Sequence, residues 1–425
     1  MRLTLQVHHV SSLDWSSGPT ALGDGAIGRL LINRADLAAE LLRDRRLTGV
    51  HFELVQPGES CRILAVSDIV EPRAKLEPAG RDFPGALTGV QAVGFGTTRV
   101  LRGMAVTVLH PNERLPGHIV DMRSGGVPGH SATDLSRFAR LHHLVVVPQL
   151  AEGVLGDEAE NALRMATLRA SAWLARTVEV GQPDAREEFT LQPVSNDLPR
   201  VAYVYQLHSH QRPTVPGEPL LYGDNCRHLL PTILHPNEVL DGAVLRAYGY
   251  FNMETYGIQN HGVISDLYAR HAIDLNFVGV VVYVANQLAA ERERATLIAS
   301  NLVRYTLQAD GAVFTKSGGG APNVDMALIA DRCESLGVKT SLILWETGAP
   351  GASDQDATLF NWPSLDAIVS IGASQLRLDL DPVERVVAPD HQSLAPFYAP
   401  MHVGPTQMCG ATDHLGAGTL MGVRY

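Results

Sequence analysis

From Leu275 onward the sequence alternates between continuous apolar segments and helical segments, and this alternation constrains the fold more strongly than any other feature. Strands that are apolar along their whole length and alternate with helices are typical of a parallel sheet with both faces covered. The predicted strands are residues 276–286, 310–316, 338–347 and 366–373, and the predicted helices are residues 288–308 and 321–337. We therefore expect residues 275–425 to form a C-terminal parallel sheet flanked by helices.

The first part of the chain has a different pattern, in which short apolar runs are separated by turn residues such as GDG at 23–25 and PGE at 57–59. This spacing favours short strands, so we expect residues 1–135 to form a β-rich N-terminal module with a helix at 34–43. Residues 136–274 are expected to form an α/β middle region, with a strand at 141–150 and an amphipathic helix at 157–178. The chain as a whole is predicted to be α/β, with an active-site segment at 201–261 between the two outer parts.

The composition limits the partners of the protein. The chain has 425 residues and a formal net charge of -11, and its isoelectric point is about 5.8. Nucleic acids and anionic membranes attract basic surfaces, so we expect neither as a partner. The longest apolar runs have the length of a strand and are too short to span a bilayer. The four cysteines form no CxxC pair, which is typical of a protein from a reducing cytoplasm.

Histidines are concentrated in residues 201–261. Residues 201–207 are rich in Val and Tyr and predict a buried strand, on which His208 and His210 face the same side if the strand continues that far. Two imidazoles on one face of a rigid element, with a third ligand from a loop, are a common arrangement for zinc. We therefore predict a divalent metal, zinc in particular, bound by His208, His210 and His235. The alternatives for the third ligand are Glu238, Cys226 and His261.

Four residues of the same segment are candidates for catalysis, namely Glu238, Glu254, Cys226 and His261. A glutamate within hydrogen-bond reach of a reacting group can serve as the general base, and a thiol can serve as a nucleophile. Structural interpretations stay open beside these roles. Glu238 can hydrogen-bond backbone groups in a turn, and a free cysteine is most often a small buried apolar residue.

A glycine-rich turn, KSGGGAPNVDM at residues 316–326, lies at the end of one predicted strand and leads into a helix. Backbone amides at such a helix start can hold a carboxylate or a phosphate. We therefore predict a cofactor- or anion-binding site at Gly318, Gly319, Gly320 and Asn323. The alternative is a simple turn in which Asn323 caps the helix. The lysine precedes the glycines and no GK[ST] follows, which excludes a Walker loop.

Several strings together resemble one family, the proprotein subunit of component B of glycine, sarcosine and betaine reductases, which is related to the D-proline reductase proprotein. The matching strings follow one another along nearly the whole chain: PGESCRILAVSDIVEPR (57–73), DLPRVAYVYQL (197–207), LLPTILHPNEVLDGAVL (229–245), LNFVGVVVYVAN (275–286), SGGGAPNVDMALI (317–329) and CGATDHLG (409–416). The resemblance implies a chain that cleaves itself at a Cys or Ser, so that the new amino terminus becomes a pyruvoyl group. It also implies that this carbonyl condenses with an amino substrate, and that a second subunit carrying cysteine or selenocysteine performs reductive C–N cleavage.

The sequence departs from the family pattern at the processing site. In that pattern the processing residue follows the segment that corresponds to DGAVL at 241–245, whereas residues 237–263 here contain neither Cys nor Ser. We therefore expect an uncleaved chain without a pyruvoyl group, in which a metal ion takes over the polarising role. The expected function is cleavage of a C–N or similarly activated bond of a small nitrogenous metabolite, by hydrolysis, elimination or reduction. A second subunit and an oligomeric assembly are expected as well.

Two alternative functions stay open. A true reductase component would cleave itself at Asn225–Cys226 and carry a pyruvoyl group. A non-catalytic scaffold subunit would only position the thiol of a partner. The mass of the denatured chain distinguishes the self-cleaving component from the metal-dependent enzyme, because self-cleavage gives two fragments and the metal enzyme stays a single species of 45.9 kDa.

Overall fold

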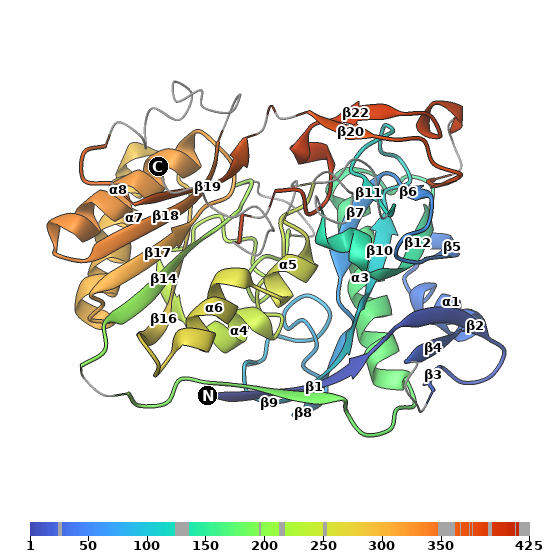
Figure 1. Ribbon diagram of the computed structural model, residues 1–425, viewed down its shortest axis with the longest axis horizontal. Helices are drawn as coiled ribbons and strands as arrows, with labels where there is room; N and C mark the ends of the chain where they lie inside the picture. Colours follow the sequence, from blue (N-terminus) through green and yellow to red (C-terminus); the bar gives the residue numbers. More distant parts are fainter. Residues whose placement is uncertain are drawn as a thin grey trace.

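The computed structural model describes residues 1–23, 28–123, 136–194, 197–211, 217–249, 253–346, 362–365, 367–373, 375, 377–389, 393–412 and 414–415. The protein is mixed α/β, as predicted, and its elements form two halves that lie side by side (Figure 1). The N-terminal half contains several sheets, and the C-terminal half is built around one large sheet. Within these ranges, the helices are too short or too polar to cross a membrane.

A six-stranded sheet with the order β15-β16-β14-β17-β18-β19 organises the C-terminal half. Its strands are β14 (Arg200–Leu207), β15 (Thr232–Leu234), β16 (Asn276–Val284), β17 (Gly311–Thr315), β18 (Lys339–Glu346) and β19 (Ile368–Ala373). Neighbouring strands are parallel except for β15 and β16, which are antiparallel. This arrangement confirms the predicted parallel sheet, whose apolar strands have side chains to bury on both faces.

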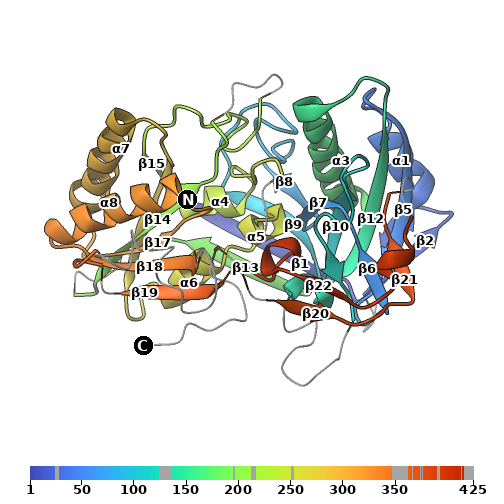
Figure 2. The ribbon, with the colours of Figure 1, turned by 90° about the horizontal axis from the view of Figure 1, so that it is seen from above.

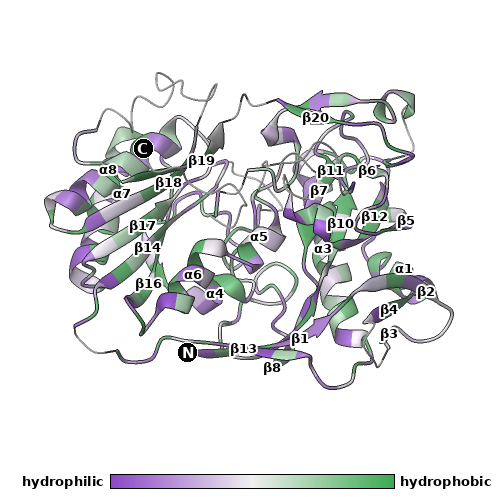
Figure 3. Cartoon of the chain, viewed as in Figure 1, coloured by the Kyte–Doolittle hydropathy of each residue, from purple (hydrophilic) through white to green (hydrophobic). Residues whose placement is uncertain are grey.

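Helices cover both faces of this sheet, and the alternation of side chains along β14 divides its residues between them. Ala202 and Val204 pack in one core with α7 (Ala289–Asn301) and α8 (Ala321–Ser335). Tyr203 and Tyr205 point to the other face, which packs against α4 (Pro236–Leu240), α5 (Thr255–Gln259) and α6 (Gly262–Arg270). Figure 2 shows α7 and α8 on one side of the sheet and α6 on the other. Figure 3 shows that the strands between them are mainly apolar.

The N-terminal half contains two four-stranded sheets, with the orders β13-β1-β9-β8 and β5-β12-β10-β7. Their strands are β1 (Arg2–His9), β5 (Leu47–Val55), β7 (Val66–Val70), β8 (Arg73–Glu77), β9 (Gly96–Arg102), β10 (Met104–Leu109), β12 (His142–Leu150) and β13 (Ala185–Thr190). Smaller sheets have the orders β2-β4-β3, β11-β6-β21 and β20-β22. Their strands are β2 (Ser12–Ser16), β3 (Ala21–Leu22), β4 (Arg29–Asn33), β6 (Cys61–Ile63), β11 (Val120–Asp121), β20 (Leu378–Leu380), β21 (Arg385–Val387) and β22 (Met401–Val403).

The long helix predicted at 157–178 is α3 (Gly156–Thr177). Asp157 and Glu158 occupy its first turn, where negative charge suits the helix dipole. Leu163 and Leu174 of α3 pack in one core with strands of the N-terminal half and with α1 (Arg34–Leu41). The helix therefore holds the N-terminal sheets together.

Hydrogen bonding between strands crosses both predicted domain boundaries. β12 pairs with β5 and β10, and β13 pairs with β1, so the first part of the predicted middle region belongs to the N-terminal half. Near the other end of the chain, β21 pairs with β6. Strands pair according to their position in space, and for this reason chain order alone does not delimit the two halves.

Candidate functional site

The loop after β14 carries His208 and His210 at the carboxyl edge of the parallel sheet, where ligands of open α/β sheets usually bind. The strand ends at Leu207, before either histidine, but the two imidazole rings still meet, with centroids 4.9 Å apart and planes at 85°. His210 Nε2 lies 2.7 Å from the carbonyl oxygen of Tyr248. Burial, together with the nearby His210, lowers the pKa of His208 to about 4. His208 is therefore a neutral imidazole at neutral pH.

His235 lies elsewhere in the fold, because β15 runs antiparallel to β16. Leu234 at the end of β15 is opposite Val280, the central residue of β16, so the chain at His235 heads toward the amino edge of the sheet. The His235 side chain caps α4, where its Nδ1 accepts a hydrogen bond from the Asn237 amide at 3.2 Å. In the part of the chain that the structure describes, no three His, Cys, Asp or Glu side chains come together as a metal site. His208, His210 and His235 therefore do not fit the predicted zinc site.

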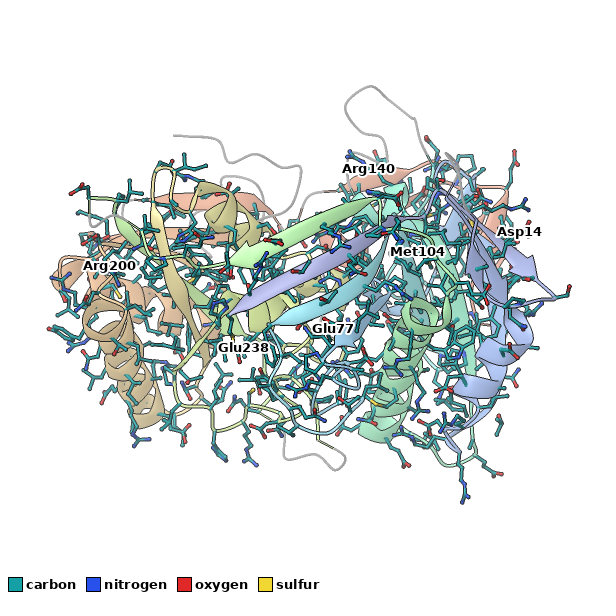
Figure 4. The ribbon with its side chains drawn as sticks, turned by 90° about the horizontal axis from the view of Figure 1, so that it is seen from below. Asp14, Glu77, Met104, Arg140, Arg200 and Glu238 are labelled. Atoms are coloured by element: carbon teal, nitrogen blue, oxygen red, sulfur yellow. The ribbon has the colours of Figure 1, made fainter. Side chains whose placement is uncertain are left out.

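Glu238 has the structural role that the sequence left open beside catalysis. Its Oε2 accepts a hydrogen bond from the His235 amide at 2.7 Å, which completes the capping box of α4. Its Oε1 accepts another from the Tyr222 hydroxyl, also at 2.7 Å. Figure 4 shows Glu238 near the middle of the molecule, between Arg200 of the C-terminal half and Met104 of the N-terminal half. Both carboxylate oxygens thus hold local structure together.

His261 is fully buried behind the carboxyl edge of the sheet. Its Nε2 lies 3.1 Å from the hydroxyl of Tyr203, which in turn lies 2.5 Å from Thr315 Oγ1 at the end of β17. Burial, together with the charge of Arg137, lowers the pKa of His261 to about 3. His261 is therefore a neutral group that is linked through Tyr203 of β14 to Thr315 of β17.

Glu254 is buried at the junction of the two halves, just before α5. Burial raises the pKa of its carboxyl, although Arg137 and Arg246 act in the opposite direction. The thiol of Cys409 hydrogen-bonds to this carboxyl, and burial raises the pKa of the thiol well above its ordinary value. A carboxyl that keeps its proton at higher pH is suited to donate it, so Glu254 retains the chemistry of a general acid or base.

The glycine-rich turn joins the same edge of the sheet, because it directly follows β17. His208 hydrogen-bonds with the backbone of Ser317, and Ser317 is only 1% exposed. Lys316 Nζ donates to the Gly318 carbonyl at 2.9 Å. Gly318 and Gly320 have positive φ angles of 84° and 68°, which residues with a Cβ rarely adopt. The anion site at this turn stays a prediction.

Asn323 does not cap α8, because Gly320 is the N-cap residue. The amide of Asn323 instead donates to the Gly320 carbonyl at 3.0 Å. His414 is a further buried residue near this turn, with a pKa lowered to about 3 by burial and by the charges of Lys316 and His208. Sequence reasoning singled out neither Lys316, which directly precedes the matching string at 317–329, nor His414, which lies in the matching string at 409–416.

Cys226 lies in a turn and has an unusual backbone conformation. The residue has a φ of 59°, a left-handed conformation that costs a residue with a Cβ about 1–2 kcal/mol. Its side chain is fully buried, and burial, together with the charge of Asp224, raises the pKa of the thiol to about 12. The carbonyl oxygen of the preceding Asn225 accepts a hydrogen bond from Ser209 Oγ at 3.1 Å. Sequence reasoning missed Ser209, which lies between the two histidines.

The Cys226 turn (residues 221–226) lies beside residues 243–245, although some twenty residues separate them in the chain. Leu221 forms a β-bridge with Val244, and the Tyr222 amide donates to the Ala243 carbonyl at 2.8 Å. Gly223 packs so closely on Gly85 that a Cβ atom would lie 2.2 Å from the Gly85 carbonyl oxygen. The turn is therefore held next to the segment that the family resemblance associates with processing.

Comparisons with known proteins agree with this resemblance. Residues 1–395 match the profile of the glycine/sarcosine/betaine reductase component B subunits. The chain is 32% identical over 374 residues to the glycine reductase complex component B subunits alpha and beta of Acetoanaerobium sticklandii, covering 85% of this chain and 83% of the relative. It is 31% identical over 372 residues to the sarcosine reductase complex component B subunit alpha of Peptoclostridium acidaminophilum, covering 85% and 84%.

The betaine reductase complex component B subunit alpha of Peptoclostridium acidaminophilum is 29% identical over 405 residues, covering 91% of this chain and 88% of the relative. No solved structure matches the chain. Both the profile and the relatives cover most of the chain, and the profile match includes the loop after β14, the Cys226 turn and the glycine-rich turn. The chain therefore belongs to the family of glycine/sarcosine/betaine reductase component B subunits.

Proposed function

We propose that this protein acts with a second subunit to cleave a C–N bond of a small nitrogenous metabolite, and that it first cleaves itself between Asn225 and Cys226. The relatives are named as components of reductase complexes for glycine, sarcosine and betaine, which supports a small amine substrate and a partner. One relative carries two subunits, alpha and beta, under a single name. This name supports a chain that is divided after synthesis.

The observation that carries the proposal is the geometry around Cys226. Three features occur together at the peptide bond between Asn225 and Cys226. Cys226 has a left-handed backbone, the Asn225 carbonyl accepts a hydrogen bond from a hydroxyl, and the turn packs closely against residues 243–245. Backbone strain that the surrounding structure maintains is concentrated at functional sites. The predicted zinc ligands, in contrast, do not come together, because His208 and His210 follow the end of β14 whereas His235 caps α4. The geometry therefore favours the self-cleaving alternative over the metal-dependent one.

The self-cleavage proceeds in steps that need only water. Cys226 Sγ attacks the carbonyl carbon of Asn225, a C–S bond forms, the C–N bond breaks, and the thiol proton ends on the released nitrogen. Elimination then removes the Cα proton of residue 226 to water, breaks the bond between Cβ and Sγ, and releases a thiocarboxylate at Asn225. Elimination leaves residue 226 with a double bond between Cα and Cβ. Water then replaces its nitrogen, ammonia is released, and a ketone forms at the new amino terminus. No oxidant or reductant is consumed.

The fold is able to keep the two products together after cleavage. β14 belongs to the fragment 1–225, whereas β16 and β17 belong to the fragment 226–425. β14 lies between them, with eight residue pairs to β16 and five to β17. Because both neighbours of a central strand lie in the other fragment, we expect the cleaved protein to migrate as a single species under native conditions.

The carboxyl edge of the sheet supplies the remainder of the proposed site. The new terminus begins near the loop of Ser209 and His210, and its ketone supplies an electrophile for an amino substrate. The glycine-rich turn, with Gly318, Gly319, Gly320 and Asn323, is proposed to hold the anionic end of the substrate with backbone amides. Glu254 is the proposed proton donor, since burial raises its pKa. The second subunit is proposed to bring the thiol or selenol that completes the reduction.

A second candidate function is an uncleaved, metal-dependent enzyme. The pair of His208 and His210, with ring centroids 4.9 Å apart, favours it. A metal bound there would need its third ligand from a residue other than His235. This candidate predicts an intact chain with about one equivalent of metal, whereas a scaffold without chemistry predicts an intact chain without metal.

One experiment separates these functions. The purified protein is denatured and its mass is measured, while a phenylhydrazine derivative tests for the carbonyl and elemental analysis measures the metal. We expect two fragments, 1–225 and 226–425, with the carbonyl on the second. Cys226→Ala should remain a single chain, and Cys333→Ala is the matched control, because Cys333 is also buried but lies in α8. A single 45.9 kDa wild-type species would overturn the proposed self-cleavage.

A further inference from the structure

We infer that Ser209 is a catalytic residue of the self-cleavage, in which its hydroxyl stabilises the negative charge that develops on the carbonyl oxygen of Asn225. The inference rests on the proposed function, because the reaction is the cleavage between Asn225 and Cys226. The observation behind it is the hydrogen bond of 3.1 Å from Ser209 Oγ to the Asn225 carbonyl oxygen. This contact joins two loops that are 16 residues apart.

The single proton of the Ser209 hydroxyl is directed at Asn225. A serine hydroxyl has one proton to donate and two lone pairs that accept. The Gln211 amide donates to Ser209 Oγ at 3.2 Å and so occupies one lone pair. The contact with Gln211 alone would be an ordinary serine turn. The contact with Asn225 is different, because it reaches the carbonyl of the peptide bond that precedes the buried cysteine.

The hydroxyl is placed where the reaction creates charge. When Cys226 Sγ adds to the Asn225 carbonyl carbon, the C=O double bond opens and its oxygen becomes negative. Donors about 2.7–3.1 Å from such an oxygen stabilise the transition state, and losing one costs on the order of 100-fold in rate. The contact is partly buried, and hydrogen bonds are stronger there than in bulk water.

Both partners of this contact are held by the fold. Ser209 follows β14, a central strand of the parallel sheet, and its neighbour His210 is bound to the Tyr248 carbonyl. Asn225 belongs to the Cys226 turn, which Gly85 holds from the other side. Since neither loop has to move for the hydroxyl to reach the carbonyl, the donor is already in position before the thiol attacks.

The test compares rates of self-cleavage in freshly synthesised full-length chains by following the two fragments on denaturing gels. We expect Ser209→Ala to slow cleavage about 100-fold. Ser171→Ala is the matched control, because Ser171 is a buried serine whose hydroxyl also donates to a backbone carbonyl, that of Glu71, at 3.0 Å. The control should cleave at the wild-type rate.

A second pair of variants removes any ambiguity from misfolding. Threonine and valine have nearly the same shape but only threonine has a hydroxyl, so Ser209→Thr should cleave far faster than Ser209→Val. Equal rates for these two variants, or a wild-type rate for Ser209→Ala, would overturn the role of Ser209 while leaving the self-cleavage itself standing. A wild-type chain that stays intact would overturn the self-cleavage, and Ser209 would then have no such reaction to catalyse.

Discussion

Self-cleavage between Asn225 and Cys226 is expected to accelerate about tenfold with each unit of pH between 7 and 9, because the thiolate is the attacking species. Burial raises the pKa of the Cys226 thiol to about 12. At that pKa about one thiol in 100,000 is ionised at pH 7 and about one in 1,000 at pH 9. The rate should therefore rise roughly 100-fold over this range. A cysteine with an ordinary pKa of about 8.5 would give only about a 25-fold rise that begins to level off.

The assay starts from full-length chain that is collected in denaturant directly after synthesis. The chain is refolded into buffers of equal ionic strength between pH 7 and pH 9, samples are quenched in acid, and the fragment 226–425 is quantified on denaturing gels. Tryptophan fluorescence at each pH shows that the chain has refolded to the same extent. Hydroxylamine provides a second readout, because it intercepts the thioester that the first step produces.

The slope of the logarithm of the rate against pH decides the outcome. A slope near one up to pH 9 agrees with a buried thiol whose proton must leave before the attack. A plateau below pH 9 would mean that the thiol ionises at its ordinary pKa and that the burial argument is wrong. A rate independent of pH would mean that loss of the thiol proton does not limit the reaction, which refutes the reasoning as a whole.

Three further outcomes are expected. Lys75→Met leaves the buried carboxylate of Asp241 without its cation, so the free energy of unfolding in urea should fall by about 3–5 kcal/mol. Arg2→Met is the control, because it breaks an exposed ion pair and should lower the free energy of unfolding by less than about 1 kcal/mol. Burial lowers the pKa of His261 and His414 to about 3, so their NMR signals should not titrate between pH 5 and pH 8. Chelators should leave activity and thermal stability unchanged if the pyruvoyl proposal is correct, and lower both if a metal is required.

The parallel sheet was predictable because burial on both faces leaves a direct trace in the sequence. β16 and β17 are apolar through most of their length, and β18 contains the apolar run LILW. Only the centre of a sheet covered on both sides accommodates such strands. The helix α3 was predictable for a related reason, since its acidic first turn and its apolar stripe occur within one continuous segment. These signals are local, and reading them does not require knowing which segments meet in space.

The metal triad shows what local signals omit. The three residues of β15 carry no mark that tells an antiparallel strand from a parallel one, yet this direction sends His235 away from His208. The capping box of α4 was also visible only as the short string HPNE, which fits a ligand and a base as well as a cap. The pairing of β13 with β1 and of β21 with β6 joins segments far apart in the sequence, and no local pattern indicates such pairing.

Cys226 is distant from residues 241–245 along the chain but close to them in space. The family resemblance directs attention to the residues after 241–245, and those residues carry no thiol. The bridge between Leu221 and Val244 shows that residues 221–226 lie beside residues 243–245, so either segment can supply the nucleophile for self-cleavage. A search for the processing cysteine that is limited to the residues after 245 leaves the other segment out. Cys226 lies on the other segment, next to a carbonyl that accepts a hydrogen bond from Ser209. The absence of a cysteine from residues 246–263 is therefore no argument against self-cleavage.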